Sequence, residues 1–218
     1  MYGLGEVCPG VEVEPGTNLL VTGPPMTGKR TLALEILAHG GRRGDGSIVV
    51  TTKDGGEDVR ERLRERVGDG ESGPVGIVDC VSRQQGTAPA DTDEITYASS
   101  PEDMTGIGIQ LSEFLRAFYE RAGVERNRIL LHSLSTLLMY SNLQTVFRFL
   151  HVFTGRVQSA DALGVFVIDG TAHERQTMST LKQLFDGQIQ VRAGDDGASE
   201  LRLRGVGTDS DWRPFSPD

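Results

Sequence analysis

Residues Leu19–Thr31 read Leu-Leu-Val-Thr-Gly-Pro-Pro-Met-Thr-Gly-Lys-Arg-Thr, and this stretch decides the fold. An apolar run leads into Gly23, and Gly28 and Lys29 then open a predicted helix, following the pattern Gly-x-x-x-x-Gly-Lys-[Ser/Thr]. In such a loop the backbone N–H groups converge on anionic oxygens, helped by the positive end of the helix that follows. The stretch therefore predicts a strand, a phosphate-binding loop and a helix.

The eighth position of this pattern is altered. Arg30 stands where a Ser or Thr hydroxyl would bind Mg²⁺, and Thr31 comes one place late. Lys29 is expected to reach the outer phosphates. The loop thus predicts nucleotide binding and casts doubt on hydrolysis. The residues predicted to hold the phosphates are Gly23, Pro24, Pro25, Met26, Thr27, Gly28, Lys29, Arg30 and Thr31.

Length and charge narrow the class of protein. The chain has 218 residues, enough for one α/β domain with a sizeable core, and we expect a single domain over 1–218. Its net charge is −9, and only three of its 22 basic residues are lysines. An acidic, lysine-poor composition is typical of proteins that stay soluble in concentrated salt, although a GC-rich genome also favours arginine. The negative charge argues against sequence-independent DNA binding as the main role, less strongly in molar salt.

Cysteines and apolar runs give further expectations. Two cysteines, Cys8 and Cys80, make no metal or disulfide framework, and we expect two buried thiols. The first residues lack a basic and then apolar signal segment, and no apolar run approaches the roughly 20 residues of a membrane span. We therefore expect a soluble, cytoplasmic protein.

Strand and helix patterns alternate along the chain. Unbroken β-branched runs such as 47–52 suit a parallel sheet buried on both faces, and Gly40 and Gly41 are expected to stop the first helix. Polar and apolar residues alternate over 200–204, after a Gly-Asp-Asp-Gly turn at 194–197, which predicts an antiparallel edge hairpin. Strands are predicted at 19–22, 47–52, 75–80, 129–131, 164–168 and 188–192, and helices at 29–39, 57–67, 105–122, 142–160 and 177–185. The pattern predicts an α/β fold with a mostly parallel, doubly wound sheet flanked by helices and a C-terminal antiparallel hairpin.

Each of two predicted helices, 57–67 and 142–160, allows both a structural and a functional interpretation. Arg60 and Arg64, with two further arginines on 57–67, alternate with acidic residues at ion-pair spacing, which favours a solvated face over a nucleic-acid site. Helix 142–160 is apolar around most of its circumference, so it is buried or contacts another chain. Trp212 and Phe215 are expected to pin the tail to the body.

Several motifs together resemble one known family. These are Gly-Thr-Asn-Leu-Leu-Val-Thr-Gly-Pro-Pro at 16–25 with Gly28 and Lys29, Arg-Ile-Leu-Leu-His-Ser-Leu-Ser-Thr-Leu-Leu at 128–138, and Leu-Phe-Asp-Gly-Gln-Ile at 184–189. They resemble the RecA-fold ATPases, in particular the KaiC-like branch that includes archaeal recombination-mediator relatives. The resemblance covers nearly the whole chain. It implies a RecA-like domain, ATP as ligand, and assembly into rings or with partner proteins; with the composition it suggests a haloarchaeal member.

The chain departs from this family at the metal and catalytic positions. The second strand of the family normally ends in two glutamates, and here Lys53 and Asp54 stand there. The fourth strand normally ends in Asp before Ser-Leu-Ser, and here it ends in His132. In an alternative register the apolar run 165–168 ends in Asp169, which would then support the metal. Asp54 and Asp169 are the candidate catalytic acids, and Lys53 and His132 join Arg30 as basic groups near the phosphates.

These departures lead to one main hypothesis and its rivals. Cationic side chains standing in for Mg²⁺ would give an ATP-binding regulatory or scaffold protein with weak or absent hydrolysis. Alternatively Thr31 or Asp169 restores a normal Mg²⁺ site, and the protein is a working ATPase in signalling or in DNA recombination and repair. A third interpretation is a DNA-recombination accessory that assembles on a partner filament. A homo-oligomer or a partner protein is expected to use helix 142–160.

Overall fold

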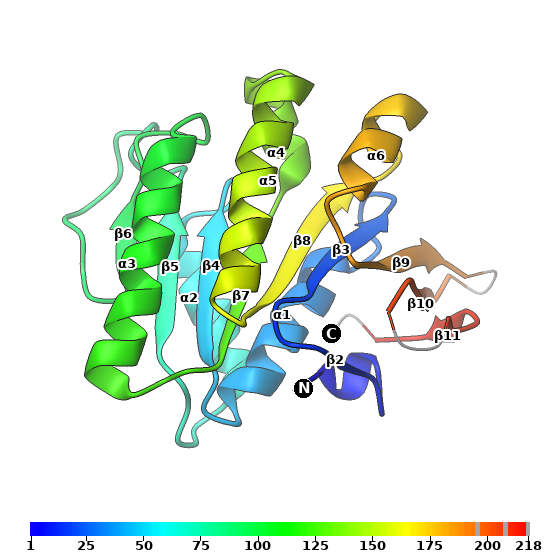
Figure 1. The fold of residues 1–218 in the computed structure, drawn as a ribbon, viewed down its shortest axis with the longest axis horizontal. Coiled ribbons are helices and arrows are strands. Elements are labelled where there is room, and N and C mark those ends of the chain that lie inside the picture. The colour runs from blue at the N-terminus through cyan, green and yellow to red at the C-terminus, as the bar shows by residue number, and fades with distance from the viewer. Residues whose placement is uncertain (195–196, 207–208, 217–218) are drawn as a thin grey trace.

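The computed structural model describes residues 1–194, 197–206 and 209–216. Within these residues the strands form a two-stranded sheet, β1–β2, and a nine-stranded sheet with the order β11-β10-β9-β3-β8-β7-β4-β5-β6 (Figure 1). All pairs from β9 to β6 in this order are parallel, whereas β10 pairs antiparallel with β9 and with β11. The predicted mostly parallel sheet with a C-terminal antiparallel hairpin is confirmed.

The strands have the following bounds. They are β1 Tyr2–Gly3, β2 Glu12–Val13, β3 Asn18–Gly23, β4 Gly46–Thr51, β5 Val75–Asp79, β6 Ile95–Tyr97, β7 Asn127–Leu131, β8 Leu163–Asp169, β9 Gly187–Ala193, β10 Ser199–Arg204 and β11 Arg213–Pro214. Every residue of β4 is buried, as expected for a strand with a layer on each face.

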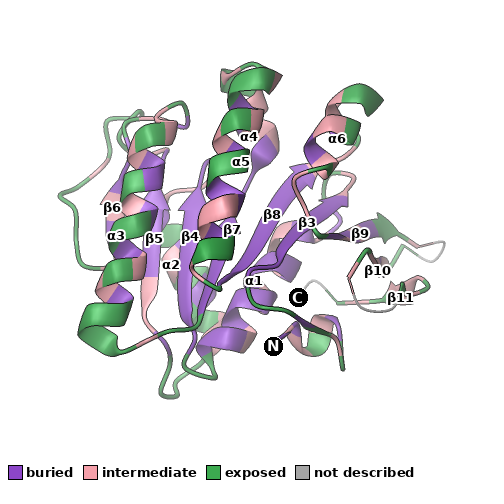
Figure 2. Cartoon of the chain, in the orientation of Figure 1, coloured by how far each residue is buried: buried purple, intermediate pink, exposed green. Residues whose placement is uncertain are grey.

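Helices cover both faces of the sheet (Figures 1 and 2). Their bounds are η1 Gly5–Val7 (a 3₁₀ turn), α1 Lys29–Gly41, α2 Gly56–Val67, α3 Met104–Ala122, α4 Leu134–Tyr140, α5 Leu143–Ser159 and α6 Arg175–Lys182. Apolar residues of α1 and α2 join one core cluster, and those of α3, α4, α5 and α6 join a second cluster on the opposite face. The sheet therefore separates two cores, and all its parallel strands end at one edge.

The first helix ends at the Gly40-Gly41 pair, as expected, but α1 includes both glycines and so ends two residues later than the predicted range 29–39. Gly40 has a second role, because the side chain of Arg128 passes beside the last turn of α1. A Cβ on Gly40 would lie 1.9 Å from Arg128 Nε, so only glycine leaves room for it. Arg128 Nη1 also donates to the carbonyl of Ile36 at 2.8 Å. Gly40 therefore also leaves the space in which Arg128 packs against α1.

The structure also contains elements that the sequence patterns did not predict. These are β1, β2, η1, β6, α4 and β11. Because β11 pairs with β10, the edge of the sheet is β11, and β10 is not the edge strand that the alternating pattern suggested. The last helix, α6, ends at Lys182 and not at 185. Asp195 and Asp196 of the predicted 194–197 turn lie outside the described residues.

Smaller expectations are borne out. Cys8 and Cys80 are free and buried. Phe215 packs against the core on the α1 face, and the guanidinium groups of Arg192 and Arg202 lie 4.1 and 4.5 Å from the ring centre of Trp212. In the part of the chain that the structure describes, we find no helix with both the length and the hydropathy needed to cross a bilayer.

Candidate nucleotide-phosphate site

The loop between β3 and α1 has the geometry expected for a phosphate-binding loop. It leaves β3 at Gly23 and ends at Gly28, which precedes α1 with a left-handed backbone (φ 76°) that favours glycine. Met26, at the tip, also has a positive φ of 57°, and its side chain is fully exposed. The chain thus turns sharply between strand and helix and directs the first turn of α1 at the carboxyl edge of the sheet.

Two side chains of this loop donate hydrogen bonds to the same backbone carbonyl. The ammonium of Lys29 donates to the carbonyl oxygen of Pro24, and Thr27 Oγ1 donates to the same oxygen at 2.9 Å. Burial lowers the pKa of Lys29, and the negative charge of Asp169 acts in the opposite direction. An anionic ligand in the loop offers this ammonium stronger, charged acceptors than a neutral carbonyl.

A cavity of about 380 Å³ opens beside the loop. It brings together most of the residues that the sequence singled out. Its lining residues are Pro25, Met26, Gly28, Lys29, Arg30, Lys53, His132, Ser133, Ser135, Val167 and Asp169. Among the predicted residues, Gly23, Pro24, Thr27, Thr31 and Asp54 do not line it, although Asp54 contacts Arg30 at its border.

The charged residues that line the cavity are mostly basic. Lys29, Arg30 and Lys53 bring cationic groups, and among the lining residues only Asp169 brings a carboxylate. This balance contrasts with the whole chain, which has a net charge of −9. A cleft that gathers cations on an acidic protein favours an anionic ligand at this place.

Arg30 is held in this cavity by a half-exposed ion pair. Its Nη1 lies 3.5 Å from Asp54 Oδ2, which also accepts from Arg62 Nη1 at 3.2 Å. Asp54 is fixed at the end of β4, because Thr51 Oγ1 donates to its carbonyl at 2.7 Å. One carboxylate therefore faces two guanidinium groups, which leaves positive charge for a ligand.

His132 lies at the end of β7 and is 1% exposed. Its Nδ1 is 3.5 Å from Thr51 Oγ1, and its Nε2 has no hydrogen-bond partner among the described residues. Burial, followed by the positive charge of Arg30, lowers the pKa of His132 to about 4. At neutral pH the imidazole is therefore uncharged, so His132 does not supply the positive charge that we expected of it.

Asp169 lies at the end of β8, directly opposite Gly23 in the parallel pairing of β3 with β8. Its Oδ1 accepts from the backbone N–H and the hydroxyl of Thr171, at 3.1 and 2.8 Å. Its own N–H donates to Ser135 Oγ at 3.0 Å, and His173 Nε2 lies 2.9 Å from the same hydroxyl. Asp169 thus caps a turn and lines the cavity as well. Because β8 lies between β3 and β7, Asp169 is nearer to the loop strand than His132.

The cavity offers Mg²⁺ few oxygen ligands of its own. This ion prefers octahedral oxygen ligands, most of them waters, phosphates and carboxylates. Ser133 Oγ accepts from the backbone N–H of Thr136 at 3.2 Å, and Ser135 Oγ is engaged with Asp169 and His173. One turn-capping carboxylate, Asp169, is left for an ion.

Two serines that line the cavity, Ser133 and Ser135, were not predicted as site residues. Ser133 caps the N-terminus of α4, and Ser135 joins Asp169 to His173. A signal was available, because a serine directly after a buried strand is a favoured residue for capping a helix. The short helix α4 was missed because its seven residues make only about two turns, too few to show a clear helical period.

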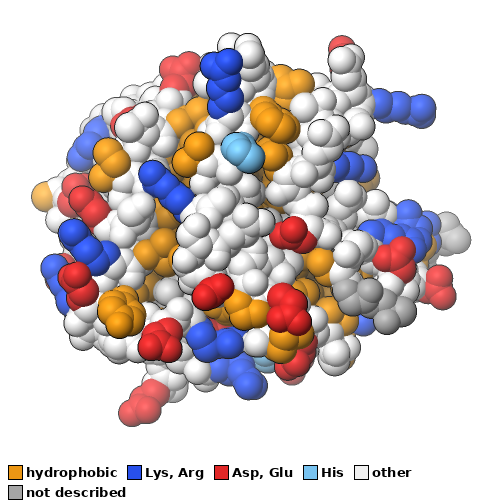
Figure 3. Space-filling view, in the orientation of Figure 1, with side chains coloured by type: hydrophobic (Ala, Val, Ile, Leu, Met, Phe, Trp, Pro, Cys, Tyr) orange, Lys and Arg blue, Asp and Glu red, His pale blue; other side chains and the backbone are white. Residues whose placement is uncertain are grey.

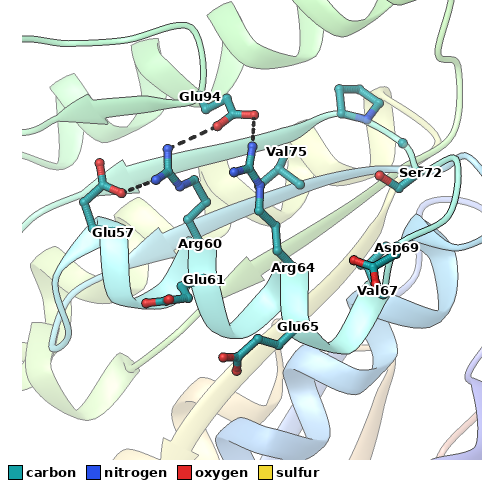
Figure 4. Close-up of a pocket in the computed structure, with 13 residues that line it drawn as sticks. Glu57, Arg60, Glu61, Arg64, Glu65, Val67, Asp69, Ser72, Val75 and Glu94 are labelled. Atoms are coloured by element: carbon teal, nitrogen blue, oxygen red, sulfur yellow. Dashed lines mark hydrogen bonds and ion pairs between the residues drawn. The ribbon is translucent and has the colours of Figure 1, made fainter.

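Two arginines of α2, Arg60 and Arg64, line a separate groove, which is drawn in Figure 4. Arg60 pairs with Glu57 on the same helix, as the spacing predicted. Glu94, which precedes β6, binds Arg60 at 3.3 Å and Arg64 at 2.6 Å. These arginines are neutralised within the chain, which supports a solvated ion-paired face and not a phosphate site.

Comparisons with known proteins agree with this geometry. A search of curated proteins finds no match. Among solved structures, the chain is similar to a KaiC-like protein from the hyperthermophilic archaeon Pyrococcus horikoshii OT3, with a TM-score of 0.68 and 14% identity over 99% of this chain and 92% of that one. At this identity the likeness shows the fold, which is RecA-like and KaiC-like. A family model matches residues 16–191, and the chain therefore belongs to the family described as "Family of unknown function (DUF7504)".

Proposed function

We propose that this protein binds a nucleoside triphosphate, with ATP the expected ligand, and that it hydrolyses the nucleotide slowly or not at all. The observation that carries the proposal is the charge of the loop cavity, where Lys29, Arg30 and Lys53 face one carboxylate, Asp169. A triphosphate needs positive charge around it, and guanidinium groups can bind phosphate oxygens with two parallel hydrogen bonds.

In this proposal Arg30 takes over part of the role of a metal ion. It follows Lys29 at the first turn of α1, where the backbone N–H groups also favour anions. A phosphate that reaches Arg30 competes with Asp54, which lies 3.5 Å away in a half-exposed pair. Such a pair contributes little in water, so its exchange for a phosphate costs little.

Slow hydrolysis follows from the groups that surround the outer phosphate. Phosphoryl transfer needs a residue that positions the attacking water, in addition to charge neutralisation. Asp54 is engaged by two arginines, and Asp169 Oδ1 is engaged by Thr171. His132 is buried, and its lowered pKa of about 4 makes it a weak base. A stable nucleotide complex suits a regulatory or scaffold role.

A working ATPase is the second candidate. It is favoured by the position of Asp169, which lines the cavity and lies opposite Gly23 in the sheet. In this alternative Asp169 supports a hydrated Mg²⁺ ion, and Arg30 stays paired with Asp54.

The test measures binding and turnover with the same protein. Calorimetric titration with ATP should give binding that Lys29→Ala weakens about 100-fold, because the ammonium nearest the loop is lost. Lys182→Ala is the matched control, since this lysine of α6 does not line the loop cavity, and it should leave the affinity unchanged. Phosphate release should stay at the level of the Lys29→Ala variant. Turnover that depends on Lys29 would establish the ATPase instead, and equal affinity of the wild type and Lys29→Ala would reject the site.

A further inference from the structure

A second cavity, of about 360 Å³, lies between α3 and α5. These helices face the viewer in Figure 3, and hydrophobic side chains show between them. The groove lies on the second core face, whereas the phosphate loop lies at the carboxyl edge of the sheet. None of the residues that line one cavity lines the other.

The walls and the floor of the groove are apolar. Ile109 on α3 is 52% exposed, and Val152 on α5 is 56% exposed. Between them Phe149 is half-buried, and its ring centre lies 5.4 Å from that of the buried Phe153. Single exposed apolar residues are ordinary, but here two of them border one groove with an aromatic floor, so a continuous apolar surface is left in water.

The charged residues of the groove have one sign. Arg148 and Arg156 line it, and none of the residues that line it, all of them described, is Asp or Glu. Arg156 is fixed there, because its Nη1 donates to the carbonyl of Gly108 on α3. Acidic residues outnumber basic ones by 31 to 22 in the whole chain, so two arginines without an acid are unlike its average surface.

We propose that this groove binds an amphipathic helix of a partner protein, with apolar residues that enter between α3 and α5 and carboxylates that meet Arg148 and Arg156. A helix laid in a groove uses anchors spaced i, i+3 or i+4, and i+7, and one helix face matches a trough between two helices. Acidic residues beside these anchors complement the two arginines, which favours an acidic over a basic helix.

A second copy of this chain fits the groove less well. In a two-fold interface the same patch contacts itself, so the arginines of one groove would approach those of the other. Like charges brought together in this way disfavour association. This inference does not depend on nucleotide binding, because the two cavities share no residue.

The experiment uses the full chain and a designed probe. The probe is a fluorescein-labelled helical peptide of about 18 residues, with leucines at the anchor spacing and glutamates beside them. A matched peptide carries lysines in place of the glutamates. Fluorescence anisotropy should show that the acidic peptide binds at least about tenfold more tightly than the basic one.

Two substitutions in the groove and one control beside it locate the binding surface. Val152→Asp places a carboxylate in the groove and should weaken the acidic peptide about tenfold, whereas His151→Asp, on an exposed neighbour that does not line the groove, should leave it unchanged. Arg148→Glu should reduce or reverse the preference for the acidic peptide. All three substituted side chains are exposed on α5, so the fold should tolerate the changes, and circular dichroism checks this.

Three results would overturn the proposal. The acidic and basic peptides could bind equally, or Val152→Asp could leave binding of the acidic peptide unchanged. Light scattering could instead show a dimer of the wild type that Val152→Asp converts into monomers. In that case a second copy of the chain is the occupant of the groove.

Discussion

Two Arg–Asp pairs lie at opposite edges of the main sheet, and they differ in every respect that matters for function. At the amino edge, Arg128 Nε lies 2.9 Å from Asp45 Oδ2, with the two side chains 1% and 4% exposed. At the carboxyl edge, Arg30 lies 3.5 Å from Asp54, and these side chains are 36% and 20% exposed. The first pair is enclosed, and the second borders a cavity.

The partners of each arginine explain the difference. Arg128 also donates to the carbonyls of Gly3 and Ile36, so its hydrogen-bonding groups are used within the fold. Among the described residues, Arg30 has no hydrogen bond or ion pair other than its contact with Asp54. A buried charge that is paired with several acceptors holds the structure together, whereas a charge with one partner beside a cavity is available to a ligand.

The largest effect should come from the enclosed pair. Arg128→Ala leaves Asp45 buried with one remaining arginine, Arg126, and should lower the free energy of unfolding by about 3 to 5 kcal/mol. Arg30→Ala is the comparison at the other edge and should cost less than about 1 kcal/mol. Urea denaturation measures both. Similar losses for the two variants would remove the distinction between a structural and a ligand-binding pair.

The next largest effect should be a change in the free energy of unfolding with pH. The folded-state pKa of His132, about 4, lies below its ordinary value of 6.5, so the unfolded chain binds a proton first. The free energy of unfolding that depends on a neutral imidazole is therefore present in full above pH 6.5. It is lost as the pH falls from 6.5 through 4, and the loss is at most about 3 kcal/mol.

His132→Asn should therefore flatten the dependence of unfolding free energy on pH between 6.5 and 4. The exposed His151 provides the control, because His151→Asn should keep the slope of the wild type. An unchanged slope in His132→Asn would show that His132 is not the group that titrates in this interval.

A smaller effect is expected on the affinity for nucleotide. Arg30→Ala should weaken ATP binding about tenfold in the absence of divalent ions, because a charged donor to the phosphates is lost. Arg62→Ala is the matched control, since Arg62 shares Asp54 but does not line the cavity. Calorimetry that finds equal losses for both variants would favour a general effect of charge over direct contact.

The smallest effect should come from Asp54. Asp54→Asn removes the carboxylate that competes for Arg30 and should strengthen ATP binding about threefold, with little change in stability. A loss of affinity in the same titration would mean that Asp54 helps to bind the ligand, for example through a metal ion.

The fold was predictable where one local pattern agreed with its three-dimensional surroundings. The run into Gly23 and the Gly28-Lys29 pair predicted β3, the loop and α1, and the buried runs predicted the other parallel strands except β6. The packing of Arg128 against Gly40 was not predicted, because the two residues are 88 positions apart in the chain and no local signal reveals such a contact. Elements such as β1 and β11, with two residues each, are too short to carry a period.

The candidate site was predictable as a set of residues but not as a set of charges. The sequence placed Lys29, Arg30, Lys53, His132 and Asp169 at one sheet edge, and all five line the same cavity. It could not show that burial keeps the imidazole neutral or that Asp54 is held by two arginines. These properties depend on solvation and on side-chain distances, which exist only in the folded chain.

The measurement that tests the central claim most directly is the affinity for ATP with Mg²⁺ and with EDTA. The account predicts that chelation changes the dissociation constant of the wild type by less than about threefold, because Arg30 and Lys53 supply positive charge. In Arg30→Thr, which restores a hydroxyl at this position, binding should become dependent on Mg²⁺. A loss of more than about tenfold when EDTA is added to the wild type would contradict the account.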